Sequence, residues 1–166
     1  MAAGRGNALM IRLLLDSAPS TVNRAKKRGL TALHGAAMVG SVDAVHVLLS
    51  AGADVVRGNA APGAFTCPLA AAVIGGSDHV LRALLASVGS GISSVVISCA
   101  LYYAVQRGRV SALKQILEVV RVRNFTWGQL RSAIPNNPRC HTHLHLAAAW
   151  GIPESVRFLL EWQANK

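Results

Sequence analysis

The sequence is poor in acidic residues. Its 166 residues include only seven Asp and Glu against 17 Lys and Arg, which gives a formal net charge of +10. The acidic residues stand apart from one another along the chain, so we do not expect a carboxylate pair for general acid–base catalysis. The glycine-rich motifs that bind nucleotide phosphates are also absent. We therefore predict a protein that is not an enzyme, with no catalytic residues and no cofactor.

Cysteines and aromatic residues are few as well. The three cysteines, Cys67, Cys99 and Cys140, are too scattered for a disulfide framework, which favours a reducing compartment. We expect an intracellular protein, in the cytoplasm first and in the nucleus as the alternative. Aromatic residues make up 5% of the chain, whereas apolar residues make up 52%. That much apolar material excludes a disordered chain.

No hydrophobic run has the character of a membrane span. The longest uncharged run, residues 83–106, is long enough to cross a bilayer, but it contains glycines and serines and follows a helical register. The apolar stretch near the N-terminus is broken by Arg12 and Asp16, which argues against a secretory signal. An arginine-rich transit peptide stays open. We predict no membrane insertion.

A pattern returns four times along the chain. Its two best copies run from Thr31 to Gly40 and from Thr142 to Gly151, each with a Leu-His pair and consecutive alanines. Weaker copies begin at positions 67 and 99, so that the spacings between equivalent positions are 36, 32 and 43 residues (31 to 67, 67 to 99, 99 to 142). In every copy apolar residues follow the glycine at the fifth, eighth and ninth positions. Ile11, Leu14 and Leu15 keep the same offsets, which indicates about four and a half repeats.

This pattern resembles the ankyrin repeat, which has a period of about 33 residues and a T-P-L-H-x-A signature. The resemblance implies an all-α solenoid of stacked antiparallel helix pairs joined by hairpin-like loops. It implies a single domain over residues 1–166. The approximate repeats are 1–28 (partial), 29–64, 65–96, 97–139 (with an insertion) and 140–166.

Particular residues suit this arrangement. Thr31 and Thr142 are predicted helix N-caps, since a hydroxyl can accept a hydrogen bond from the first turn. Cys67 and Cys99 stand at the same position of the weaker copies and are expected at N-caps too. The glycines that close each copy are expected to be left-handed, because helices commonly end in that conformation; they are Gly40, Gly76, Gly108 and Gly151.

Two insertions interrupt the repeat period. Residues 57–66 are rich in Gly, Ala and Pro and are predicted to form a loop. Residues 119–141 exceed the period, and within them residues 126–134 are predicted to form a short extra helix. Insertions in such arrays commonly project from one face.

One cluster of side chains has the character of metal ligands. Cys140, His141, His143 and His145 fall within six residues and could in principle hold zinc or copper. The repeat pattern accounts for His145 without a metal, however, and the spacing is not that of a structural zinc site. We therefore predict no metal site.

Proteins that resemble ankyrin arrays are usually binding scaffolds, whose partners meet the hairpin tips and the concave face formed by the first helix of each pair. We accordingly predict a monomer that binds another protein through an acidic or amphipathic segment. Mapping those positions gives Lys27, Arg28 and Leu30 at one tip, Arg139 and His141 at another, and Met38, Val39, Ile74, Gln106, Arg107 and Trp150 on the concave face.

Two alternatives stay open. Thirteen of the 17 basic residues fall in residues 1–30 and 107–139, which would also suit nucleic acid or another anionic surface. The chain could instead be a structural segment of a longer array.

Overall fold

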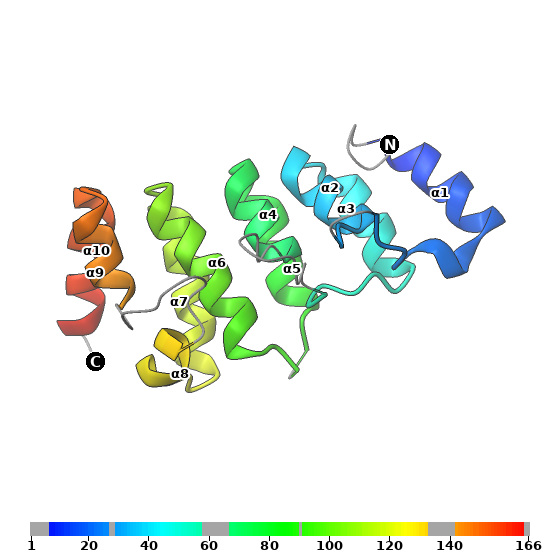
Figure 1. Cartoon of the computed structure of the whole chain (residues 1–166). Coiled ribbons are helices and arrows are strands. Elements are labelled where there is room, and N and C mark those ends of the chain that lie inside the picture. Colours follow the sequence, from blue (N-terminus) through cyan, green and yellow to red (C-terminus); the bar gives the residue numbers. More distant parts are fainter. Residues whose placement is uncertain (1–6, 27–28, 58–66, 90, 133–141, 165–166) are drawn as a thin grey trace.

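Helix pairs stacked in a row make up the structure, a computed structural model (Figure 1). It describes residues 7–26, 29–57, 67–89, 91–132 and 142–164. Within these ranges every regular element is helical, as the repeat pattern predicts. The first helix of each pair is here called an inner helix: α2 (Ala32–Val39), α4 (Pro68–Gly75), α6 (Ser94–Gln106) and α9 (His143–Ala149). The others are outer helices: α1 (Ala8–Ser17), α3 (Val42–Ser50), α5 (Asp78–Ser87), α7 (Val110–Val122) and α10 (Pro153–Ala164).

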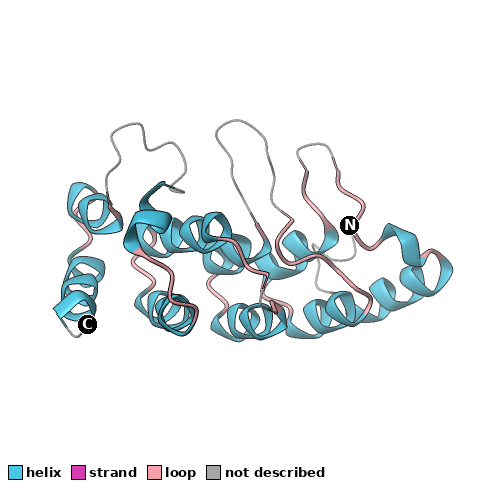
Figure 2. Ribbon diagram, turned by 90° about the horizontal axis from the view of Figure 1, so that it is seen from below, coloured by secondary structure: helices cyan, strands magenta, loops and turns pink. Residues whose placement is uncertain are grey.

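Each helix packs on its equivalents in the neighbouring repeats. Inner helices contact inner helices in the order α2, α4, α6 and α9, while α1, α3, α5, α7 and α10 form the outer series. Figure 2 shows these as two rows running the length of the molecule. A short 3₁₀ helix, η2 (Pro19–Thr21), follows α1. The core is therefore one continuous seam along the stack.

Three of the four expected N-caps are confirmed. The Thr142 hydroxyl accepts from the backbone N–H of His145, and the Cys67 sulfur accepts from that of Ala70. Thr31 shares a capping box with His34, whose Nδ1 accepts from the Thr31 backbone N–H at 3.2 Å. Each cap satisfies a helix-end donor that lacks an intrahelical partner.

The expectation for Cys99 is wrong. The α6 helix begins at Ser94, and its N-cap is Ser93, whose hydroxyl accepts from the backbone N–H of Val96. Cys99 therefore lies inside the helix with no exposed surface. The physical reason is that residues 94–98 contain no glycine or proline, and their apolar side chains extend the buried face of the helix by more than a turn.

The closing glycines adopt the conformation that the sequence predicts. Their φ angles are +80° at Gly40, +79° at Gly76, +61° at Gly108 and +65° at Gly151. Side chains with a Cβ atom rarely adopt such angles. A Cβ atom at Gly76 would come within 2.6 Å of the Arg109 guanidinium, an exposed group at the end of a flexible side chain that can move away.

Small residues bring the inner helices close together. Several alanines of these helices have no exposed surface, and a Cβ atom at Gly75 would overlap the carbonyl group of Met38 in the neighbouring helix. A larger side chain at these positions would push the helices apart, because protein interiors are close-packed. The fully buried alanines of the inner helices are Ala36, Ala37, Ala70, Ala72, Ala100, Ala104 and Ala147.

The second insertion contributes a helix, as predicted. It is α8 (Trp127–Ser132), which packs on α6. The Ser98 hydroxyl donates to the backbone carbonyl of Leu130 at 2.8 Å, and the rings of Trp127 and Trp162 meet edge to face at 5.3 Å. Residues 133–141 of that insertion and residues 58–66 lie outside the described residues.

None of the helices in the described ranges combines the length and the apolar character that a membrane span requires.

Candidate partner-binding surface

The C-terminal ends of the inner helices form an exposed row across the array. Val39, Gly75, Arg107 and Trp150 occupy the same position of four successive repeats, and all four are exposed. The preceding position is occupied by Met38, Ile74, Gln106 and Ala149, of which only Ile74 is half-buried. The candidates on this face are here called the inner row: Met38, Val39, Ile74, Gln106, Arg107 and Trp150.

The row changes in chemistry from one end to the other. Met38 and Val39 are apolar and remain 45% and 53% exposed. Gln106 and Arg107 supply hydrogen-bond donors and a positive charge at the end of α6. Trp150 supplies an aromatic ring. Such a mixture of apolar, cationic and aromatic side chains is typical of protein interfaces.

Trp150 packs on a neighbouring helix and still reaches solvent. Its ring meets Tyr102 of α6 edge to face at 5.2 Å, and Tyr102 meets Tyr103 in the same way at 5.2 Å. The Trp150 residue nevertheless keeps 37% of its surface exposed. Burial raises the pKa of the Tyr103 phenol, so this group stays neutral near pH 7. An aromatic cluster therefore holds Trp150 in place at one end of the inner row.

Sequence reasoning did not include Tyr102 and Tyr103 among the functional residues. One signal was available: Tyr102 stands where the two best copies of the repeat have a histidine. Because the histidine position precedes the inner row by about one helical turn, a large ring there can support the side chain beside it.

Comparison with known protein families identifies the repeats. Residues 1–59 match the family model described as ankyrin repeats (3 copies). Residues 1–59 are thus similar to ankyrin repeats. The crystal structure of the human ASB11 ankyrin repeat domain is similar over 97% of this chain and 66% of that chain, with a TM-score of 0.71 and 24% sequence identity. That likeness extends the ankyrin fold along almost the whole chain. This chain thus spans just under two thirds of that domain, and the curated proteins contain no match to it.

The tip candidates are only partly described. Leu30 is half-buried and lines a cavity between α1 and α2. The other tip candidates lie outside the described residues, so their placement at hairpin tips stays a prediction: Lys27, Arg28, Arg139 and His141.

The histidines of the last repeat have separate structural roles. His143 is buried beneath α6, where its Nε2 lies 3.4 Å from the Ser98 backbone oxygen, and burial lowers its pKa to about 4. His145 is exposed, and its Nδ1 lies 2.8 Å from the Thr142 hydroxyl. Within the described ranges no three potential metal ligands gather in one place; Cys140 lies outside them.

The two described cysteines are buried between repeats. Neither Cys67 nor Cys99 has exposed surface. The Cys99 thiol donates a hydrogen bond to Cys67, and this bond, together with burial, raises the pKa of Cys99. A nucleophile needs access to its substrate, so these thiols belong to the interior of the array.

Basic residues after α6 are partly engaged within the chain. Arg121 pairs with Glu118 at 2.7 Å, and Arg123 donates to the Gly89 carbonyl at 3.1 Å. The Lys114 ammonium lies 5.8 Å from the centre of the Phe158 ring. These three cations lie on or after an outer helix, whereas Arg107 ends an inner helix.

Ankyrin repeats generally act as protein–protein interaction modules, and the fold is typically non-catalytic.

Proposed function

We propose that this chain is a non-catalytic interaction scaffold that binds an acidic or amphipathic segment of another protein through the inner row. The observation that carries the proposal is the exposure of Val39, Arg107 and Trp150 at equivalent positions of successive repeats. An extended or helical segment lying across the array would contact these side chains one after another. Aromatic and arginine residues are the usual anchors of such interfaces.

The distribution of acidic residues favours an acidic partner. None of the four inner helices contains Asp or Glu, whereas all five outer helices do. The inner face therefore has no carboxylate on its helices to compensate Arg107. A partner that brings its own carboxylates would gain charge complementarity, which acts mainly on specificity and on the rate of association.

The proposal can be tested with a displayed library of random peptides. The wild-type chain serves as bait, and the recovered peptides are measured against two double variants that change the net charge equally. One is Val39→Glu with Arg107→Glu on the inner row. The control is Val122→Glu with Arg82→Glu at exposed positions of outer helices.

We expect recovered peptides enriched in Asp and Glu beside apolar residues. Their affinity should fall by about tenfold or more for the inner-row variant and stay unchanged for the control, a difference of about 1.4 kcal/mol. Equal losses of affinity for both variants would show that only the net charge matters, and would refute the inner row as the binding site. A low-salt gel shift of DNA that the inner-row variant abolishes would favour the nucleic-acid alternative, since such binding weakens steeply with salt.

A further inference from the structure

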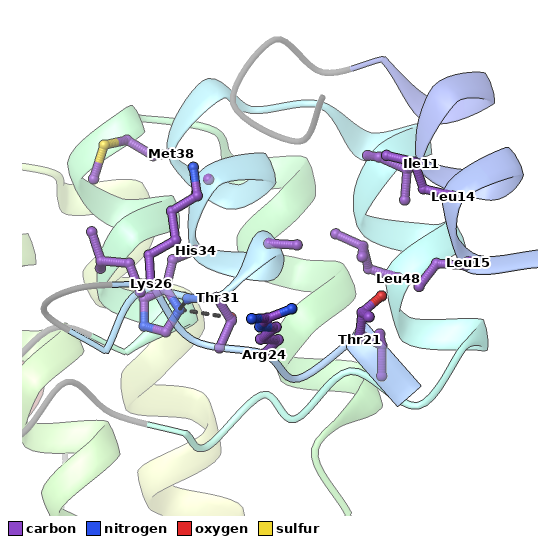
Figure 3. A pocket seen from close by; sticks show the side chains of 14 residues that line it. Ile11, Leu14, Leu15, Thr21, Arg24, Lys26, Thr31, His34, Met38 and Leu48 are labelled. Atoms are coloured by element: carbon purple, nitrogen blue, oxygen red, sulfur yellow. Dashed lines mark hydrogen bonds between the residues drawn. The ribbon is translucent and has the colours of Figure 1, made fainter. Parts of the chain in front are cut away.

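A second candidate binding surface lies at the N-terminal end of the array. A cavity of about 320 Å³ opens between α1 and α2. Figure 3 shows Leu14 and Leu15 of α1 on one side, His34 and Met38 of α2 on the other, and Arg24 on the segment between the two helices. Within the described residues, α1 is an outer helix that has no inner helix of its own.

The repeat register explains why α2 is open on this side. Ala32 and Gly35 of α2 correspond to Pro68 and Ala71 of α4, one repeat later. Pro68 and Ala71 are buried, because α2 packs against that face of α4. Ala32 and Gly35 are only partly buried, since no described inner helix precedes α2. The open face of α2 is therefore the surface that an inner helix covers in the next repeat.

The outer helix α1 leads to the same conclusion. Leu14 occupies the position that is held by Leu48, Leu84, Ile116 and Leu159 in the later repeats. Those four side chains have at most 1% of their surface exposed, whereas Leu14 is 55% exposed. A leucine at a core position thus faces an unfilled space. The cavity has the place and the lining of an inner helix in the repeat register.

The rim of the cavity is positively charged. Arg24 and Lys26 line it, are exposed, and take part in no ion pair among the described residues. Both lie near Thr31, the N-cap of α2. A helix that continued the stack would run parallel to α2, so its first turn would lie beside these two cations. Acidic residues in a first turn also suit the helix dipole.

We propose that this cavity binds an amphipathic α-helix of a partner protein, with the helix in the inner position of the first repeat. The small apolar face of that helix covers Leu14 and Gly35, and acidic residues in its first turn face Arg24 and Lys26. This site is separate from the inner row, with which it shares only Met38. The mode is that of a helix in a groove, where apolar anchors recur every three or four residues.

The test uses three labelled synthetic peptides of about 18 residues, long enough to form a helix. They share an Ala/Leu face and carry Glu, Gln or Lys in the first turn. Binding to the whole chain is followed by fluorescence anisotropy. The key variant is Leu14→Glu. Its matched control is Leu13→Glu, because Leu13 lies on the same helix, is also 55% exposed and does not line the cavity.

We expect the Glu peptide to bind about tenfold or more tightly than the Gln peptide. Leu14→Glu should weaken both, Leu13→Glu should weaken neither, and Arg24→Glu with Lys26→Glu should shift the preference to the Lys peptide. Absence of saturable binding, or equal losses at positions 13 and 14, would overturn the proposal. If the Val39→Glu/Arg107→Glu variant lost the Glu peptide and Leu14→Glu kept it, the peptide would occupy the inner row instead. That result would overturn the helix site and leave the proposed function standing.

Discussion

Burial of His143 is expected to make the stability of the array depend on pH. The residue has 1% of its surface exposed, and its Nδ1 atom has no hydrogen-bond partner. Burial lowers its pKa to about 4 from an ordinary 6.5, although the Ser98 carbonyl oxygen partly opposes the shift. The folded protein therefore holds His143 neutral under conditions in which the unfolded chain binds a proton.

The direction and size of the effect follow from proton linkage. Because the folded pKa is the lower one, the neutral side chain contributes its full stability above pH 6.5, and this contribution is lost as the pH falls toward 4. One pKa unit corresponds to about 1.4 kcal/mol, so the complete loss is about 3 kcal/mol. Between pH 7 and pH 5 the loss from this residue alone should be about 2 kcal/mol.

Urea denaturation at the two pH values measures this loss. Tryptophan fluorescence is a suitable signal, since the Trp127 ring lies 6.5 Å from the His143 ring. The wild-type chain and a control variant, His145→Gln, should lose about 2 kcal/mol more than His143→Gln between pH 7 and pH 5. In addition, the His143 imidazole should show no NMR titration above about pH 5 in the folded protein. An identical pH dependence in all three proteins, or titration of His143 near its ordinary pKa, would refute the reasoning.

Three further predictions concern the stability of the stack. Gly76→Ala and Gly52→Ala should cost similar amounts, about 1–2 kcal/mol of backbone strain, because their φ angles are +79° and +81° and the exposed Arg109 side chain can move away from a Cβ atom at 76; thermal denaturation measures both, and a clearly larger loss at 76 would contradict this reasoning. Leu101→Ala, at a side chain with no exposed surface, should destabilise the protein by about 2–5 kcal/mol in urea denaturation, and an effect near zero would contradict the packing of α6. Ser98→Ala removes the donor to the Leu130 carbonyl and should cost about 1–3 kcal/mol, with faster hydrogen exchange in α8; unchanged exchange there would show that the bond does not hold the insertion.

The features that could be predicted from the sequence are those that every repeat needs for its own local structure. A glycine at the end of each inner helix, an acceptor at most of the N-caps and apolar residues at fixed offsets are local requirements, so they recur and can be recognised. His34 and His145 both contact the threonine three residues before them, so the histidine of the signature has the same local role in both copies. The short helix of the second insertion was predicted from local residues too.

Features that depend on neighbouring repeats were not predicted. The early start of α6 misled the assignment of Cys99, because a helix can be extended without disturbing the repeat register. The contact between Tyr102 and Trp150 joins two helices separated by an insertion. The exposure of Leu14 could not be recognised from its offset, which is that of a core residue. It depends on which helices pack beside α1, and the repeat pattern does not give that.

The few acidic residues gather on one side of the array, on or beside the outer helices. Asp43, Asp78 and Glu154 stand in the first turns of outer helices, where a negative charge stabilises the helix dipole. Asp54 accepts hydrogen bonds from the backbone in a turn, and Glu118 pairs with an arginine one turn away. Each therefore has a local role on or beside the outer row of helices. Since the inner helices carry none, the positive charge on their side is left uncompensated, and both proposed binding surfaces favour the same kind of partner: an apolar segment that brings its own carboxylates.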